Sequence, residues 1–215
     1  MDTNARERVV RKLLKEAGTT YAEEAGVRLK DQPMPLFQLL TLCMLASKPI
    51  DATIAMQAGR ELFRAGLRTP QAALKADRST MIKAFGRAHY VRYDESSATR
   101  LVDIARAVRD DYDGDLRQLA SKAGQDPKAV TRLLKQFKGI GDTGADIFLR
   151  EVQDVWTWAR PHFDKRAVAA ARQLGLPRDP DELSALAPRN NAKLASALVR
   201  VSLDDELRDK LSSQR

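Results

Sequence analysis

The chain has 215 residues, of which 43% are hydrophobic and 31% are charged, so it can bury a sizeable core and is too charged to lie embedded in a membrane. Its formal net charge of +8 makes a polyanionic partner such as nucleic acid plausible. The one cysteine, Cys43, lies in the apolar run LLTLCMLA. This excludes internal disulfides and also metal or Fe–S clusters that are held by cysteines.

The first residues contain no apolar segment of the kind found in signal peptides, and no stretch of the sequence stays apolar for the length of a membrane span. We therefore expect a protein of the reducing cytoplasm that does not associate with membranes.

The hydrophobic periodicity is helical almost throughout, and no stretch alternates as a strand would. In chain order, the pattern predicts a surface helix over 4–18 and a core helix over 35–47 that is apolar on nearly every side. Asp51 caps the next expected helix, Pro70 opens a short one, and Ser79 caps another.

A longer helix is expected around 101–108, where apolar residues recur at spacings of three and four. Asp126 and Pro127 then cap and open a helix over 128–137, and Asp164 caps a helix that starts at 165. Two more helices follow, and residues 204–215 are expected to fray.

The segment KGIGDTGADIF, residues 138–148, is typical of a tight hairpin between two helices. Gly139 and Gly141 permit positive φ and remove side chains, so backbone N–H groups can approach a ligand oxygen. The second helix begins near Asp142 or Thr143, where free N–H groups and the helix dipole favour an anion such as a phosphate diester. The alternative is a helix C-cap with a second glycine for close packing.

Asp164 follows the hairpin after one helix and a loop. It is a preferred residue for capping the helix that it precedes, and it is also a carboxylate that the chain could bring back beside the hairpin. These two roles are compatible.

The sequence resembles the helix-hairpin-helix DNA glycosylases of the endonuclease III superfamily over roughly residues 34–175. The hairpin residues Gly139, Ile140, Gly141 and Ala145 match, as does Asp164 with its following helix, and the core helix PLFQLLTLCMLAS is similar to the first core helix of that family.

The resemblance implies an all-α fold of two helical lobes with a helix-hairpin-helix motif, similar to that of endonuclease III. It implies one lobe over 34–152 that contains the hairpin, and a second lobe over 1–33 and 153–215 that carries the catalytic aspartate.

Two departures from the family bear on the reaction. Bifunctional members carry a lysine at the position of Thr143, and threonine cannot form the Schiff base through which they cut the strand. Lys138 and Lys165 are poor substitutes because of their positions. The four-cysteine Fe–S cluster of many relatives is also absent. The resemblance therefore implies a monofunctional enzyme, in which Asp164 stabilises the cation that forms as the base leaves.

The resemblance also implies roles for other side chains. Lys48 aligns with one position that fills the gap left by a flipped base, and Arg92 or Tyr93 lies near the other, although Lys48 also fits an ordinary loop lysine. Trp156, Trp158 and His162 are candidates for the base pocket or, equally, for packing. The residues expected to contact DNA are Gly139, Gly141, Lys138, Thr143, Lys48, Arg92 and Tyr93.

The expected function is thus a monomeric, monofunctional DNA glycosylase of base excision repair, associated with the nucleoid. It acts on double-stranded DNA containing a damaged or mismatched base, without cofactor or metal. One alternative is a non-catalytic helix-hairpin-helix protein that recognises abasic or distorted DNA. Another is a helical scaffold unrelated to DNA. The identity of the excised base stays open.

Overall fold

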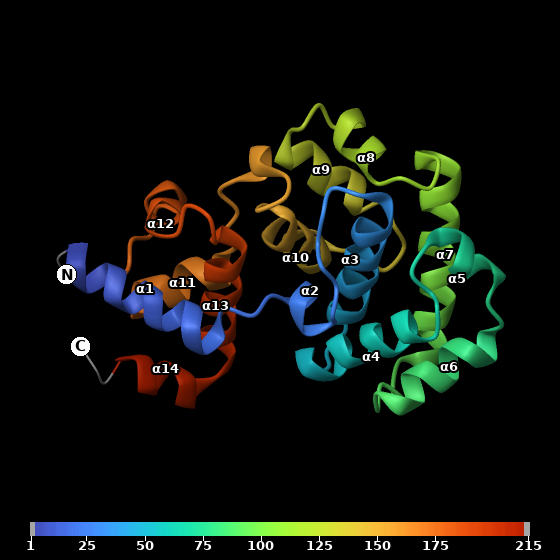
Figure 1. The fold of residues 1–215 in the computed structure, drawn as a ribbon, viewed down its shortest axis with the longest axis horizontal. Coiled ribbons are helices and arrows are strands. Elements are labelled where there is room, and N and C mark those ends of the chain that lie inside the picture. The colour runs from blue at the N-terminus through green and yellow to red at the C-terminus, as the bar shows by residue number, and fades with distance from the viewer. Residues whose placement is uncertain (1–2, 213–215) are drawn as a thin grey trace. The chain divides into compact units, whose positions relative to one another are not determined.

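The computed structural model describes residues 3–212, and every element within that range is helical. This confirms the prediction of an all-α protein. The chain divides into two compact units, which we call the central unit (Tyr21–Phe148) and the terminal unit (Met1–Thr20 with Leu149–Arg215). Figure 1 shows the elements in chain order.

The central unit contains a sequence of short and medium helices joined by tight turns. Its elements are α2 (Tyr21–Glu24), α3 (Pro33–Ala46), α4 (Ala52–Arg64), α5 (Pro70–Lys75), α6 (Arg78–Arg87), α7 (Asp94–Tyr112), α8 (Arg117–Lys122), α9 (Pro127–Leu134) and the first part of α10 (Asp142–Val152).

Helix α3 is the core of the central unit. Every residue from Pro35 to Leu45 is buried, and α2, α4 and α7 pack against the helix. This confirms the expected core helix, although it begins at Pro33, because proline is favoured in the first turn.

Two of the three capping residues predicted in the central unit are confirmed. Asp51 and Asp126 accept hydrogen bonds from first-turn N–H groups of α4 and α9, as predicted. The prediction for Ser79 is wrong. The extended backbone of Asp77 puts that residue at the N-cap of α6, and Ser79 lies inside the first turn.

The terminal unit is assembled from both ends of the chain. Its elements are α1 (Thr3–Ala17), the end of α10, the 3₁₀ turn η1 (Thr157–Ala159), α11 (Lys165–Gln173), α12 (Pro180–Leu186), α13 (Asn191–Leu203) and α14 (Asp205–Ser212). Helix α13 packs against both α1 and α11, and their apolar side chains form the core of this unit.

The C-terminal segment differs from its prediction. Within the expected fraying tail 204–215, residues 205–212 form α14, whose Leu211 is buried in the terminal core. The Nζ atom of Lys210 also lies 2.6 Å from the Glu16 Oε2 on α1. These contacts keep the segment helical, although its composition alone is typical of a solvated chain end. Residues 213–215 lie outside the described range.

The observed unit boundaries fall at 20/21 and 148/149, whereas the sequence placed them at 33/34 and 152/153. The first difference has a packing cause: α2 contacts α3 and α4, and Tyr21, Ala22 and Val27 are buried. These contacts place the segment that precedes α3 in the central unit.

The buried carboxylate of Glu61 on α4 provides a test of the central unit. Arg87 Nε lies 2.6 Å from one Glu61 oxygen and Arg64 Nη1 lies 2.8 Å from the other. Hydrogen bonds from Arg87 and then Arg64 lower the pKa of Glu61 below its usual 4.5. Such a carboxylate adds stability above its unfolded pKa and loses it as the pH falls through the folded pKa.

We therefore expect Glu61→Gln to lower the free energy of unfolding by about 1–2 kcal/mol near pH 7, because two charge-assisted hydrogen bonds are weakened. Urea unfolding at a series of pH values should show the difference between wild type and variant shrinking below about pH 4.5. A difference that is constant with pH would contradict an ionised, stabilising Glu61.

Candidate functional site

The hairpin between α9 and α10 is anchored by Ile140. This residue is buried, and its N–H donates to the carbonyl oxygen of Phe137 at 3.0 Å. Gly139 precedes it with a φ of +93°, a conformation that L side chains rarely adopt. The turn therefore needs glycine at 139 and an apolar residue at 140.

Gly141 has a different role from Gly139. Its φ is not positive, and a Cβ atom added there would meet no other atom within 4 Å. Neither backbone strain nor close packing requires this glycine. Close approach occurs instead at Gly144, where an added Cβ would lie 2.7 Å from Ser47 Oγ at the end of α3. The absence of a side chain at Gly141 leaves the start of α10 open.

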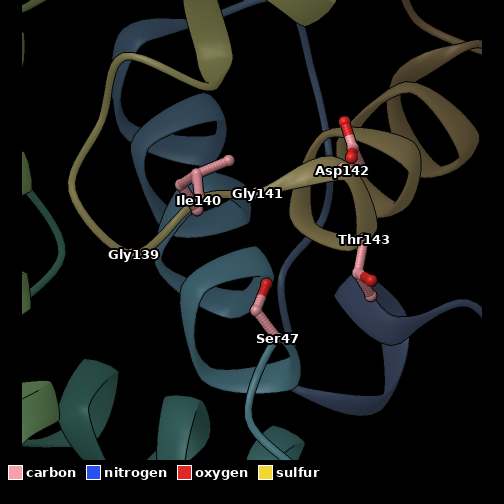
Figure 2. Close-up of a pocket in the computed structure, with 6 residues that line it drawn as sticks. All are labelled: Ser47, Gly139, Ile140, Gly141, Asp142 and Thr143. Carbon is pink, nitrogen blue, oxygen red and sulfur yellow. The ribbon is translucent and has the colours of Figure 1, made fainter.

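An open hollow of about 450 Å³ lies at this start of α10 (Figure 2). The first backbone hydrogen bond of the helix runs from Ala145 N to Gly141 O at 3.0 Å, so the preceding N–H groups have no partner within the helix. N–H groups of this kind are suited to bind an anion. The hollow is lined by Ser47, Gly139, Ile140, Gly141, Asp142 and Thr143.

The charges around the hollow have both signs. Lys138 is exposed on the hairpin. Asp142 is also exposed, and its carboxylate would repel a phosphate, but Lys135 Nζ lies 2.5 Å from Asp142 Oδ1 and offsets that charge. Thr143 is exposed and lines the hollow, so it offers a hydroxyl where a lysine would offer an amine.

Lys48, Arg92 and Tyr93 lie together in the central unit. Lys48 Nζ is 5.7 Å and Arg92 Cζ is 5.4 Å from the centre of the Tyr93 ring. Distances of this size are typical of cation–π contacts. The expected gap-filling residues therefore form a single cluster of two cations on one aromatic ring. Lys48 directly follows Ser47 in sequence, so the cluster lies next to the end of α3.

Tyr90 fixes the loop that carries this cluster. Its side chain is fully buried, and its hydroxyl lies 3.3 Å from Leu45 O and 3.2 Å from Ser97 Oγ. Burial raises the pKa of the Tyr90 phenol above its usual 10.0, so it stays a neutral hydrogen-bonding group. The buried tyrosine holds the loop against the last turn of α3.

Sequence reasoning missed Arg100. The side chain of this α7 residue lies beside the hairpin, since its Cδ would be 3.4 Å from a Cβ atom added at Gly139. Its guanidinium also pairs with Asp103 at 3.0 Å. Only the packing of α7 against the hairpin turn distinguishes it from other surface arginines of that helix.

Asp164 caps α11 in the terminal unit, as predicted. Its Oδ1 accepts a hydrogen bond from Ala167 N at 2.9 Å. Its Oδ2 lies 3.4 Å from Nη1 of Arg150, a residue that sequence reasoning also missed. The Asp164 side chain is 11% exposed, and that of Arg150 only 2%.

Gln153 fixes the loop that leads to Asp164. This residue is fully buried; its Oε1 accepts from His162 N at 2.9 Å and its Nε2 donates to His162 O at 3.0 Å. The His162 backbone is thus held on both sides. The His162 ring is therefore attached to a loop whose backbone is fixed.

The two tryptophans stack on each other, with ring centres 5.2 Å apart and an angle of 21° between the ring planes. Trp156 is 3% exposed, so its ring serves mainly as a packing anchor. Trp158 keeps partial exposure and is the ring of the pair that has surface to offer a ligand.

No protein-family model, curated protein or solved structure matches this chain. Within residues 3–212, no helix combines the length and apolar character needed to cross a membrane. In the same range, no group of three or more His, Cys, Asp or Glu side chains is arranged to hold a metal ion.

The two hairpin glycines should respond differently to the same substitution. We expect Gly139→Ser to lower the free energy of unfolding by about 1–3 kcal/mol, because serine must adopt the strained conformation. Gly141→Ser should change it by less than about 0.5 kcal/mol, because serine is a good N-cap residue and its Cβ has open space. Urea unfolding near pH 7 measures both. Equal losses would contradict the distinct roles of the two glycines.

Proposed function

We propose that this protein is a monofunctional DNA glycosylase of base excision repair. It hydrolyses the N-glycosidic bond of a damaged or mismatched base that is flipped out of duplex DNA, and it leaves an abasic site. The observation that carries the proposal is the hairpin of the central unit, whose buried Ile140 and left-handed Gly139 support an open start of α10.

Binding to DNA follows from this hairpin. Its N–H groups would donate hydrogen bonds to the oxygens of a backbone phosphate, a contact that positions DNA without reading its sequence. Lys138 on the turn and Arg100 beside it add positive charge. The cluster of Lys48, Arg92 and Tyr93 supplies two further cations and an aromatic ring, which suit the gap that a flipped nucleotide leaves.

Asp164 is the carboxylate to which we assign the chemistry. Cleavage of the bond between base and sugar develops positive charge on the deoxyribose ring. A carboxylate near C1′ stabilises that charge and can accept a proton from the attacking water. The cap on α11 holds this carboxylate in a defined place.

Thr143 sets the outcome of the reaction. A bifunctional enzyme attacks C1′ with an amine and then cleaves the strand, and a threonine hydroxyl cannot form that imine. The product is therefore an intact strand with an abasic site. We propose an endonuclease III-like arrangement of the fold, a monomer acting on the DNA of the nucleoid in the cytoplasm, and catalysis without a cofactor.

One observation favours a second candidate, a non-catalytic protein that recognises abasic or distorted DNA. Both oxygens of Asp164 are engaged, one by the helix cap and the other by Arg150. A purely structural aspartate would show the same contacts. Catalysis distinguishes the two candidates, because both predict DNA binding.

We expect Asp164→Asn to slow base release at least about 100-fold in single-turnover experiments on a lesion duplex that the wild type processes. Asparagine is also a good N-cap residue, so the variant should stay folded and bind DNA. Base release at the wild-type rate would remove Asp164 from the mechanism. Binding of lesion duplexes with no release by wild type would favour the second candidate.

The hairpin can be tested separately through DNA affinity. Gly141→Ser should weaken binding to a duplex that contains an abasic-site analogue by about tenfold, because the new side chain blocks a phosphate contact. Fluorescence anisotropy at two salt concentrations measures this, and wild-type affinity should fall steeply with salt.

Gly86→Ser on α6 is the matched control. Gly86 is exposed, and a Cβ added there also meets open space. The Gly86→Ser variant should therefore bind the duplex with the affinity of the wild type. Equal affinities of the two serine variants would argue against the hairpin as the DNA contact.

A further inference from the structure

The terminal unit buries a chain of charged side chains beside Asp164. Arg150 Nη1 lies 3.4 Å from Asp164 Oδ2, and Arg150 Nε lies 3.8 Å from Glu151 Oε1. The Ser196 hydroxyl on α13 in turn donates to Glu151 Oε1 at 3.1 Å. The side chains of Arg150 and Glu151 are 2% and 0% exposed.

We infer that Arg150 is a positioning residue that fixes the orientation of the Asp164 carboxylate for cleavage of the glycosidic bond. This inference rests on the proposed function, and it assigns to Arg150 a role that acts through Asp164 rather than on the substrate.

The geometry around Asp164 supports this role. The hydrogen bond from Ala167 N holds only Oδ1, and a carboxylate held by one oxygen can still rotate about its Cβ–Cγ bond. Contact with Arg150 at Oδ2 restricts that rotation. The distance of 3.4 Å between Arg150 Nη1 and Asp164 Oδ2 exceeds the 2.7–2.9 Å usual for charge-assisted hydrogen bonds. This weak contact orients Oδ2 and leaves its lone pairs available.

Burial gives the second argument. Transfer of a guanidinium from water to a protein interior costs several kcal/mol, and a well-packed apolar residue often serves stability as well or better. A buried arginine next to the one carboxylate assigned to chemistry is therefore better explained by orientation than by stability.

The test is a kinetic double-mutant cycle with Arg150→Gln, Asp164→Asn and the double variant, measured as single-turnover base release from a duplex that wild type processes. We expect Arg150→Gln to slow release about 10-fold to 100-fold, since misplacement of a catalytic group by about 1 Å has effects of this size. Affinity for an abasic-analogue duplex should change by less than about twofold, because Arg150 touches no DNA in this scheme.

The decisive comparison is in the Asp164→Asn background. If Arg150 acts through the Asp164 carboxylate, the double variant should be no slower than Asp164→Asn alone. Arg150→Lys keeps the charge, so its rate should lie between those of wild type and Arg150→Gln. It also provides the same cycle should the glutamine variant fail to fold. Glu61→Gln, which weakens a buried ion pair of the central unit, controls for loss of stability and should keep the wild-type rate.

Each outcome bears on the inference. Multiplicative slowing in the double variant, or a wild-type rate in Arg150→Gln, would overturn the role of Arg150 and leave the proposed function intact. Absence of base release by the wild type from every lesion class would overturn the proposed function, and this inference with it.

Discussion

Burial of α3 is the constraint on which the central unit depends. Because every residue from Pro35 to Leu45 is buried, the C-terminal end of this helix is a fixed point for the segments that meet there. The hairpin approaches Ser47 through Gly144, and the loop after α6 is tied to Leu45 by the Tyr90 hydroxyl. A single buried helix thus positions both the hollow at the start of α10 and the cluster of Lys48, Arg92 and Tyr93.

In the terminal unit, hydrogen bonds hold the loop that leads to the Asp164 carboxylate. Gln153 pairs with both backbone groups of His162, and Asp154 accepts hydrogen bonds from the first turn of α13. The buried Gln153 and the partly exposed Asp154 therefore fix the path of the chain up to Asp164, and Arg150 then contacts the carboxylate. Hydrogen bonds thus order the segment that leads to Asp164, where the sequence has no cysteines that could do so as metal ligands.

Local signals made much of the fold predictable. The caps Asp51, Asp126 and Asp164 depend on immediate neighbours, and the all-round apolarity of α3 implies burial. Contacts between distant segments were not predictable. Burial of Leu211, which keeps α14 folded, requires a surface built by other helices. The positions of Arg100 and Arg150 likewise depend on packing, since no local pattern separates them from exposed arginines.

We propose that the hairpin and Asp164 belong to a glycosylase without strand-cleaving activity. A single-turnover screen of wild-type protein against duplexes carrying uracil or thymine mismatches, alkylated purines or oxidised bases tests it directly, with strand products read before and after alkali. We predict that at least one lesion yields strand breaks only after alkali. Breaks that appear without alkali, or no breaks from any lesion under either condition, would contradict it.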